Sequence, residues 1–170
     1  MNRYSPHIAA TEIVRDAGGE IVGRTRLQKI AYLMEIGGLQ SGFTFEYKHY
    51  GPFSEDLATA VDIAVAFGDL KEAEKTAEWG GKYSIFRVDV GHSHPSSSRS
   101  KFISEAKRID AVELELAATA AYLFLAEGYG SRRQDNPWME TARRKPQKAD
   151  KGRLQKAAAA YRTLRKVAPQ

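Results

Sequence analysis

The sequence contains no cysteine among its 170 residues. Disulfides, thiolate nucleophiles and cysteine-based zinc sites are therefore excluded. Long hydrophobic runs are also missing, because the longest apolar stretches are about a dozen residues and carry Glu, which is too little for a membrane span. The first residues lack the basic start and apolar stretch of a signal peptide. We therefore expect a cytoplasmic protein with no membrane association.

The familiar signatures of catalytic and nucleotide-binding sites are absent as well. The sequence has no G-x-S-x-G, Walker-type loop, G-x-G-x-x-G or H-E-x-x-H. The glycine pairs at 18–19 and 37–38 are interpreted as helix ends, because neither follows a predicted strand and opens a helix. We therefore predict a protein that is not an enzyme and holds no cofactor. An active site assembled from distant residues is the remaining catalytic alternative.

Histidines offer little capacity for metal binding. His92 and His94 form a pair in a Ser-rich stretch, residues 91–100, which is predicted to be a loop. A zinc site needs three or four ligands, so the pair is interpreted as part of a solvated loop and no metal site is predicted. His7 and His49 are isolated in the sequence.

Charge is distributed unevenly between the two parts of the chain. Residues 131–170 contain 12 Lys and Arg against three Asp and Glu, whereas residues 1–130 contain 14 against 18. A mildly acidic body with a strongly basic C-terminal segment favours an anionic partner, either nucleic acid or an acidic protein surface. The alternative is a solvated helix that is rich in Lys and Arg.

Apolar residues at helical spacing predict three helices in the first 70 residues, at about 6–17, 25–36 and 55–67. Ser5, Thr25 and Ser54 are the expected N-caps, and glycines follow each helix. Alternating aromatic residues at 43–47 predict a short strand, and Tyr-Gly-Pro-Phe at 50–53 predicts a turn. Residues 69–90 are predicted to form a β-hairpin, although 71–78 also suit a helix by propensity. Three helices followed by a hairpin is the order of a winged helix.

The second half is predicted to be helical. Asp110 and Glu113 form a capping box before a helix that is apolar almost all round at 112–124, which indicates a place in the core or at an interface such as a homodimer. Asn136-Pro137-Trp138 begins another element, and Lys151–Val167 is a basic helix. The fold class is therefore mainly α (α+β). We expect one domain, 1–170, with a winged-helix-like hairpin, a long central helix and a basic helical segment at about 131–170.

Basic side chains surround the start of the second predicted helix. Arg24, Arg26 and Lys29 lie there, and Arg26 and Lys29 are predicted on its outer side. In a helix-turn-helix this region crosses the DNA backbone, but the charges equally suit a solvent-exposed face. The third helix stands in the place of a recognition helix, yet it carries three acidic residues and no Lys or Arg. That acidity argues against binding in the major groove.

Three short motifs stand out along the chain. They are Arg-Leu-Gln-Lys-Ile-Ala-Tyr-Leu at 26–33, Tyr50-Gly51-Pro52, and Pro137-Trp138. In this order they resemble the KLQKLLYL helix, the YGP turn and the PW element of the Panacea-domain, SocA-like antitoxin family and its YwgA-type relatives. The family's usual Thr-His before PW is absent, since Gln-Asp-Asn stands at 134–136, and the basic tail is closer to YwgA-type proteins.

The resemblance implies a mostly helical domain that acts by binding a partner protein. In the family that partner is commonly a toxin that is held inactive by contact, and some members deliver a toxin to a protease. No catalytic residues are carried over. We therefore expect a non-catalytic protein-binding module of the antitoxin type. A winged-helix-like, nucleic-acid-binding regulator is the alternative.

Aromatic residues and Arg are enriched at protein interfaces, which indicates candidate contact residues. The candidates for the partner face are Arg24, Arg26, Lys29, Tyr32, Tyr47, Tyr50 and Phe53. For Tyr32, Tyr50 and Phe53, a place in the core is the alternative. The candidates for nucleic-acid binding lie in the basic segment and are Arg132, Arg133, Arg143, Arg144, Lys145 and Lys148.

Overall fold

The computed structural model describes residues 5–91 and 97–169, and this part of the chain is mainly helical with two small antiparallel sheets. The predicted loop that holds His92 and His94 falls partly outside the described residues, and both histidines do. The elements are α1 Pro6–Asp16, β1 Glu20–Val22, α2 Arg24–Ile36, β2 Glu46–Lys48, β3 Gly51–Phe53, α3 Glu55–Phe67, β4 Lys71–Thr76, β5 Lys82–Arg87, α4 Ser98–Arg108, α5 Ala111–Leu125, α6 Pro137–Arg144 and α7 Lys151–Val167.

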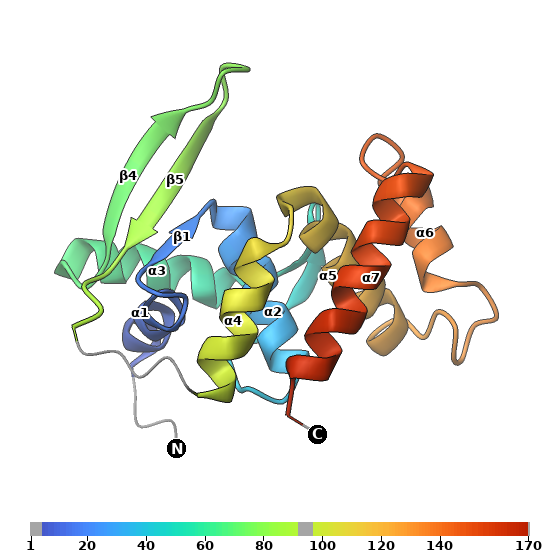
Figure 1. Cartoon of the computed structure of the whole chain (residues 1–170), viewed down its shortest axis with the longest axis horizontal. Helices are drawn as coiled ribbons and strands as arrows, with labels where there is room; N and C mark the ends of the chain where they lie inside the picture. The colour runs from blue at the N-terminus through green and yellow to red at the C-terminus, as the bar shows by residue number, and fades with distance from the viewer. Residues whose placement is uncertain (1–4, 92–96, 170) are drawn as a thin grey trace.

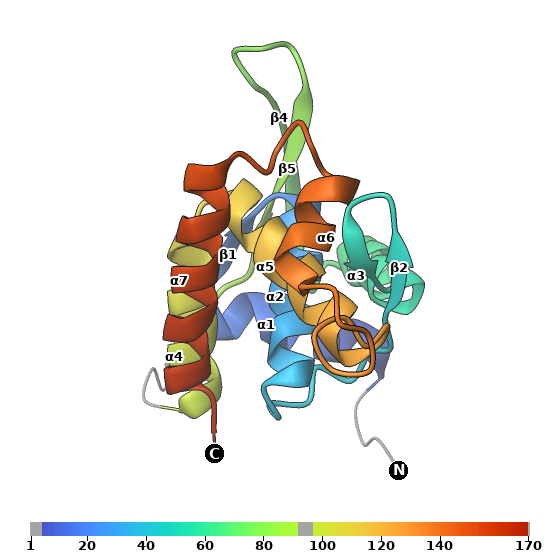
Figure 2. The ribbon, with the colours of Figure 1, turned by 90° about the vertical axis from the view of Figure 1, so that its right-hand side faces the viewer.

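Helix α5 occupies the centre of the molecule. Figures 1 and 2 show it between α2 on one side and α6 and α7 on the other, while α1 lies against α3. Every side chain from residue 114 to residue 121 is buried, so the prediction of a central, apolar helix is confirmed. Small residues such as Ala117 and Ala118 allow neighbouring helices to approach closely. None of the helices in the described ranges has the length and apolar character needed to cross a bilayer.

The predicted hairpin is confirmed, and it projects from the helical body (Figure 1). Strands β4 and β5 pair antiparallel, and β1 joins them in the order β1-β5-β4. Residues 71–76 are therefore extended, because pairing with β5 outweighs their helical propensity. Trp79 lies at the turn of the hairpin and is 81% exposed. Strand β1 is only three residues long, which is too short to give a sequence signal.

Two of the predicted N-caps are confirmed in position and one is wrong. Ser5 and Ser54 precede α1 and α3, and Ser54 Oγ accepts a hydrogen bond from Leu57 N. Helix α2 begins at Arg24, so its N-cap is Gly23 rather than Thr25. The reason is that Gly23 N donates to the Ser84 carbonyl next to the sheet, and its φ of 98° turns the chain directly into the helix.

The segment 43–53 differs in detail from the prediction. The strand lies at Glu46–Lys48, and residues Gly51–Phe53, predicted as a turn, form strand β3 that pairs with it. The turn itself consists of His49 and Tyr50. Pro52 is compatible with this two-stranded ribbon because an edge strand tolerates a residue without an N–H.

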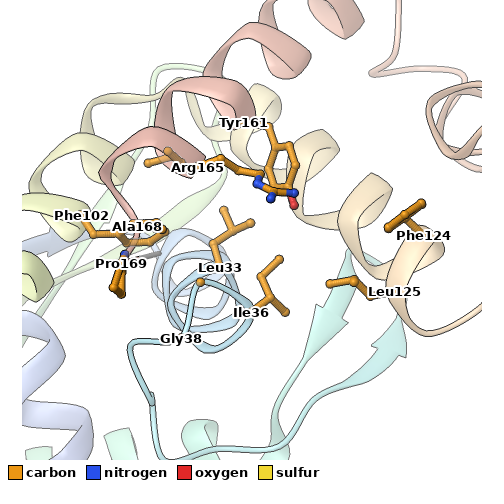
Figure 3. A pocket seen from close by; sticks show the side chains of 12 residues that line it. Leu33, Ile36, Gly38, Phe102, Phe124, Leu125, Tyr161, Arg165, Ala168 and Pro169 are labelled. Atoms are coloured by element: carbon orange, nitrogen blue, oxygen red, sulfur yellow. The ribbon is translucent and has the colours of Figure 1, made fainter.

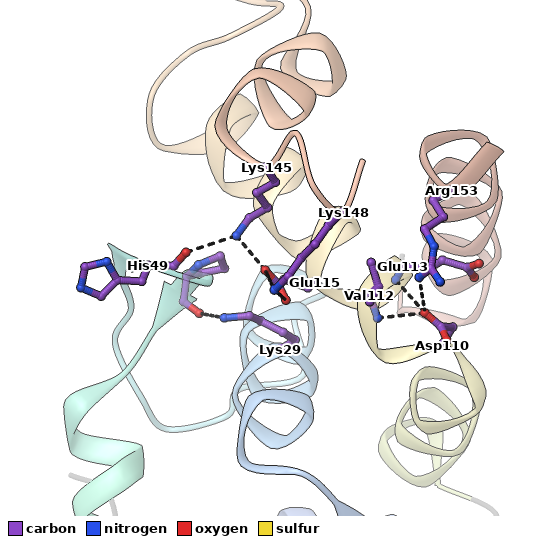
Figure 4. Close-up of polar contacts among 10 residues, drawn as sticks. Lys29, His49, Asp110, Val112, Glu113, Glu115, Lys145, Lys148 and Arg153 are labelled. Carbon is purple, nitrogen blue, oxygen red and sulfur yellow. Dashed lines mark hydrogen bonds and ion pairs between the residues drawn. The ribbon is translucent and has the colours of Figure 1, made fainter. Parts of the chain in front are cut away.

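The helices of the second half begin at side-chain caps. Asp110 Oδ1 accepts from Val112 N and Glu113 N, as Figure 4 shows, and Asn136 Oδ1 accepts from Trp138 N. Helix α7 has the predicted bounds, with Ala157 and Leu164 buried. The loop predicted at 91–100 is too long at its end, because α4 begins at Ser98. There, Ser97 Oγ accepts from the backbone N–H of Ser100 and caps the helix.

Candidate functional site

Two of the sequence motifs meet in the core through side-chain hydrogen bonds to the backbone. Gln28 Nε2 donates to the Ser54 carbonyl at 2.9 Å, and Gln28 Oε1 accepts from Ser54 N at 2.8 Å. Lys29 Nζ donates to the Pro52 carbonyl at 2.7 Å. Gln28, Lys29, Pro52 and Ser54 are all buried. These bonds hold β3 and the start of α3 against α2, so the two motifs form a structural junction.

The prediction that Lys29 lies on the outer side of its helix is wrong. Its side chain is among the largest fully buried ones, at 1% exposure. Burial lowers the pKa of Lys29 to about 7, because the ammonium loses its hydration. A helix with one solvated face would expose this position, whereas every residue of α2 from Leu27 to Met34 is buried. Lys29 therefore lies beneath the surface on which a partner would bind.

The two arginines near the start of α2 contact other parts of the same chain. Arg24 is exposed and forms ion pairs with Asp62 at 3.2 Å and Glu72 at 2.7 Å. Arg26 is half-buried, and its guanidinium donates to the carbonyls of Lys107 at 3.0 Å and Ile109 at 2.5 Å. Arg26 thus ties α2 to the connection between α4 and α5.

The four aromatic candidates differ in burial and do not form one exposed surface. Tyr32 is buried and packs edge-on against Phe45, so its alternative place in the core is the observed one. Burial raises the pKa of its hydroxyl. Tyr47 and Phe53 are half-buried, and only Tyr50 is exposed, at 55%. Of the seven predicted contact residues, the structure thus leaves Arg24 and Tyr50 open to solvent, on separate elements.

The arginines of the basic segment are largely engaged within the molecule. Arg144 forms ion pairs with Glu127 at 2.7 Å and Glu140 at 2.9 Å, and its guanidinium lies over the ring of Tyr47. Hydrogen bonding to Glu127 and Glu140 raises the pKa of Arg144. Arg143 also pairs with Glu140. These carboxylates reduce the positive charge that the segment presents to a polyanion.

The remaining four basic candidates differ in exposure: two are exposed, Lys148 is half-buried and Lys145 is buried. Arg132 and Arg133 are exposed and donate to the carbonyls of Ala126 and Glu127. Lys145 is buried and pairs with Glu115 at 2.7 Å, and Lys148 pairs with the same carboxylate at 2.9 Å (Figure 4). The six residues predicted for nucleic-acid binding therefore form no continuous exposed patch.

A groove at one end of the helical body gathers apolar side chains that the sequence analysis did not select (Figure 3). Its volume is about 710 Å³. Leu33, Phe102 and Leu164 are buried at its base, while Phe124 and Leu125 stand at its edge and are 43% and 53% exposed. Arg165 is the one charged residue among the described residues that line the groove. The groove has the composition of a binding surface for an apolar segment.

A signal for the groove was present in the sequence. The apolar character of α5 continues through Phe124 and Leu125 to the end of the helix, beyond the length that the core covers. The other contributors come from the ends of α2 and α7 and from Phe102 of α4, which are far apart in the sequence. Only the packing of these helices brings them together.

Comparison with curated proteins relates the chain to a protein of Bacillus subtilis. No protein-family model matches the chain. The chain is similar to the uncharacterised protein YwgA of Bacillus subtilis (strain 168), with 25% identity over 122 residues, which are 68% of this chain and 73% of that protein. A YwgA-like relationship is thus supported, whereas membership of the wider Panacea-domain superfamily stays a prediction.

Proposed function

We propose that this chain is a non-catalytic protein-binding module, and that the groove between the ends of α2, α5 and α7 receives a segment of its partner. The observation that carries the proposal is the exposure of Phe124 and Leu125 at the end of a helix whose preceding turns are buried. Large apolar side chains that line a concave surface mark interaction sites in soluble proteins.

The lining of the groove defines the chemistry of its occupant. Apolar side chains from four helices, α2, α4, α5 and α7, surround it, and Arg165 supplies one positive charge at its edge (Figure 3). A partner helix with large apolar residues three or four positions apart fits such a groove. A carboxylate on that helix would pair with Arg165. We therefore propose an amphipathic helical segment with one acidic residue as the occupant.

The resemblance to antitoxins gives this module a biological role. In that family the partner is commonly a toxin that is held inactive by contact, and some members present a toxin to a protease. The similarity to YwgA does not bear on this role, because that relative is uncharacterised. We propose a toxin encoded by a neighbouring gene as the first partner to test.

The test compares substitutions at the groove with one elsewhere on the surface. Phe124→Glu and Leu125→Glu place a carboxylate where an apolar segment would be buried, and Met139→Glu on α6 is the control because Met139 is 63% exposed and does not line the groove. The proteins encoded by adjacent genes are co-expressed, and binding is measured by calorimetry. A stable complex should weaken by at least about tenfold in both groove variants, since a buried unpaired charge costs more than about 1.4 kcal/mol.

The outcomes separate the competing occupants of the groove. Unchanged affinity in both groove variants would refute the groove as the binding surface. If the chain formed no complex with any neighbouring gene product and did not rescue growth against one, the proposal of a protein-binding module would be refuted. Light scattering measures the oligomeric state of the chain. A dimer that Leu125→Glu converts to a monomer would show that a second copy of this chain fills the groove.

The nucleic-acid alternative is less favoured, because four of its six candidate residues pair with carboxylates of the same chain. Phosphate contacts make binding to duplex DNA fall steeply with salt. Titration of DNA at several salt concentrations therefore tests the alternative directly. Binding with a steep salt dependence, lost in an Arg132→Gln, Arg133→Gln variant, would favour nucleic acid over protein.

A further inference from the structure

The turn between β2 and β3 and the segment that follows α6 enclose a second cavity, of about 340 Å³. It is lined by His49, Tyr50, Arg144, Lys145, Pro146, Gln147 and Lys148. These two segments are almost a hundred residues apart in the sequence, and Lys145 Nζ links them by donating to the His49 carbonyl at 3.4 Å. The volume lies within the range of about 300–1,000 Å³ that is usual for small-molecule sites.

Positive charge exceeds negative charge around this cavity. Four cations, Arg143, Arg144, Lys145 and Lys148, share three carboxylates, those of Glu115, Glu127 and Glu140. The buried Lys29 lies beside this cluster (Figure 4), and its ammonium donates to the Pro52 carbonyl at 2.7 Å. The charges of Lys145 and Lys148 both lower the pKa of Lys29, although burial is the larger cause. Even without Lys29, the four paired cations outnumber the three carboxylates by one.

The geometry leaves donors available at the mouth of the cavity. Lys148 is 36% exposed, and its ammonium bonds Glu115 Oε1 at 3.1 Å and Oε2 at 2.9 Å. An ammonium has three N–H groups, so one remains for a ligand while Glu115 stays bound. Gln147 adds an exposed amide to the lining. Lys145, at 5% exposure, supplies fixed positive charge from behind.

We propose that this cavity binds a small molecule through a phosphoryl group, held by Lys148 and Gln147 in the field of Lys145 and Arg144. A phosphoryl oxygen accepts charge-assisted hydrogen bonds of the kind that ammonium groups donate. The ring of Tyr50, which is 55% exposed with Lys148 Nζ 4.9 Å from its centroid, offers an adjoining apolar surface for the organic part of a phosphate ester. The cavity is concave and its deeper lysine is buried, which favours a small ligand over the backbone of a duplex.

This proposal is independent of the protein-binding groove, because the two sites share no lining residue. It is tested by calorimetric titration of the full chain at constant ionic strength with inorganic phosphate, ribose 5-phosphate and adenosine 5′-monophosphate. Lys148→Gln is the site variant. Lys151→Gln is the matched control, since Lys151 is exposed in the first turn of α7 and does not line the cavity.

We expect saturable binding by the wild type, a loss of about tenfold or more in affinity in Lys148→Gln, and no change in Lys151→Gln. Thermal unfolding of both variants checks that the fold is retained. Tyr50→Ala distinguishes the sources of the phosphoryl group. It should weaken the binding of the nucleotide and leave inorganic phosphate unaffected if an ester is preferred, and it should change neither if free phosphate is the ligand.

Three outcomes would overturn the proposal. The first is the absence of saturable binding for all three probes. The second is an equal loss of affinity in Lys148→Gln and Lys151→Gln, which would mean a general effect of charge. The third is displacement of the probes by duplex DNA with Arg132→Gln as damaging as Lys148→Gln, because the cavity would then belong to an extended nucleic-acid surface.

Discussion

The junction between α2 and β3 and the groove at the ends of α2, α5 and α7 show opposite departures from the usual distribution of side chains. At the junction, the polar side chains of Gln28 and Lys29 are buried, and each has a hydrogen-bond partner on the backbone. At the groove, Phe124 and Leu125 are apolar and exposed. Buried polar groups that have hydrogen-bond partners help to specify a structure, whereas exposed apolar groups mark surfaces that bind a partner. The junction therefore stabilises the fold, and the groove is the site of the proposed function.

The largest effect is expected where β3 meets α5. Gly51 has a φ of 91°, and a Cβ at this position would collide with Thr119 Oγ1. Gly51→Ala should lower the free energy of unfolding by about 3 kcal/mol, through backbone strain and overpacking. Gly68→Ala is the matched control, because Gly68 has a φ of 79° and open space around it. Urea denaturation measures both.

A second substitution separates backbone strain from overpacking as causes of the loss of stability expected in Gly51→Ala. Thr119 Oγ1 is buried and lacks a hydrogen-bond partner in the described part of the chain, so its removal sacrifices no bond. When Thr119→Ala is combined with Gly51→Ala, the loss of stability that comes from overpacking should disappear. The remaining loss in the free energy of unfolding should then equal that of Gly68→Ala, which comes from backbone strain alone. A double variant no more stable than Gly51→Ala would show that the contact with α5 is unimportant.

The next effect tests whether the junction depends on its buried polar bonds. Gln28→Leu introduces an apolar side chain of similar size. It leaves the Ser54 N–H without its partner and removes one of the two bonds to the Ser54 carbonyl, which still accepts from Ala58 N. We expect a loss of about 2 kcal/mol in the free energy of unfolding, since buried unsatisfied groups are costly. Gln155→Leu on the exposed side of α7 is the control, with a change below about 0.5 kcal/mol. Equal losses in Gln28→Leu and Gln155→Leu would show that the buried hydrogen bonds of Gln28 add no stability to the junction.

Lys29 makes the junction sensitive to pH. Its folded pKa of about 7 lies below the ordinary 10.5, so between these values the unfolded chain binds more protons at this side chain. The free energy of unfolding should therefore rise with pH above about 7, by about 1 kcal/mol per pH unit, and the cost of the buried charge is fully present below that pH. Lys29→Met should flatten the rise, as measured by urea denaturation at about pH 7, 8 and 9. If the free energy of unfolding rose in parallel with pH in the wild type and in Lys29→Met, the assignment of the pH dependence to Lys29 would be contradicted.

The smallest effect is expected at the groove. Leu125→Glu should change the free energy of unfolding by less than about 0.5 kcal/mol, because the side chain is already 53% exposed. This contrasts with its proposed large effect on partner binding. A loss above about 2 kcal/mol, seen by thermal or urea unfolding, would mean that Leu125 serves the core and would erase the contrast between the two regions.

Much of the secondary structure could be predicted from local patterns. The periodicity of residues 55–67 and 151–167 was sufficient for α3 and α7, and Ser54 and Asp110 acted as the expected caps. Strand β1 and helix α4 were not predicted, since a three-residue strand has no period and α4 begins within a Ser-rich stretch. Such elements depend on pairing or packing with distant residues.

The candidate site could be predicted less well. Residue type suggested that Arg24, Lys29 and Tyr32 form an outer face, but Lys29 and Tyr32 are buried because α2 is covered on all sides. The six basic residues of the C-terminal segment suggested a polyanion surface, but Glu115, Glu127 and Glu140 lie close to four of them. Neither the burial nor the pairing has a local signal.

The amino-acid sequence by itself determined the mainly helical class, the hairpin after α3 and the apolar nature of α5, because capping and periodicity act over a few residues. Only the tertiary structure decided which faces meet solvent. It placed Lys29 inside and Leu125 outside, and it joined the His49–Tyr50 turn to residues 144–148 around one cavity. Exposure and charge pairing depend on contacts between distant segments, and these contacts exist only once the helices have packed around α5.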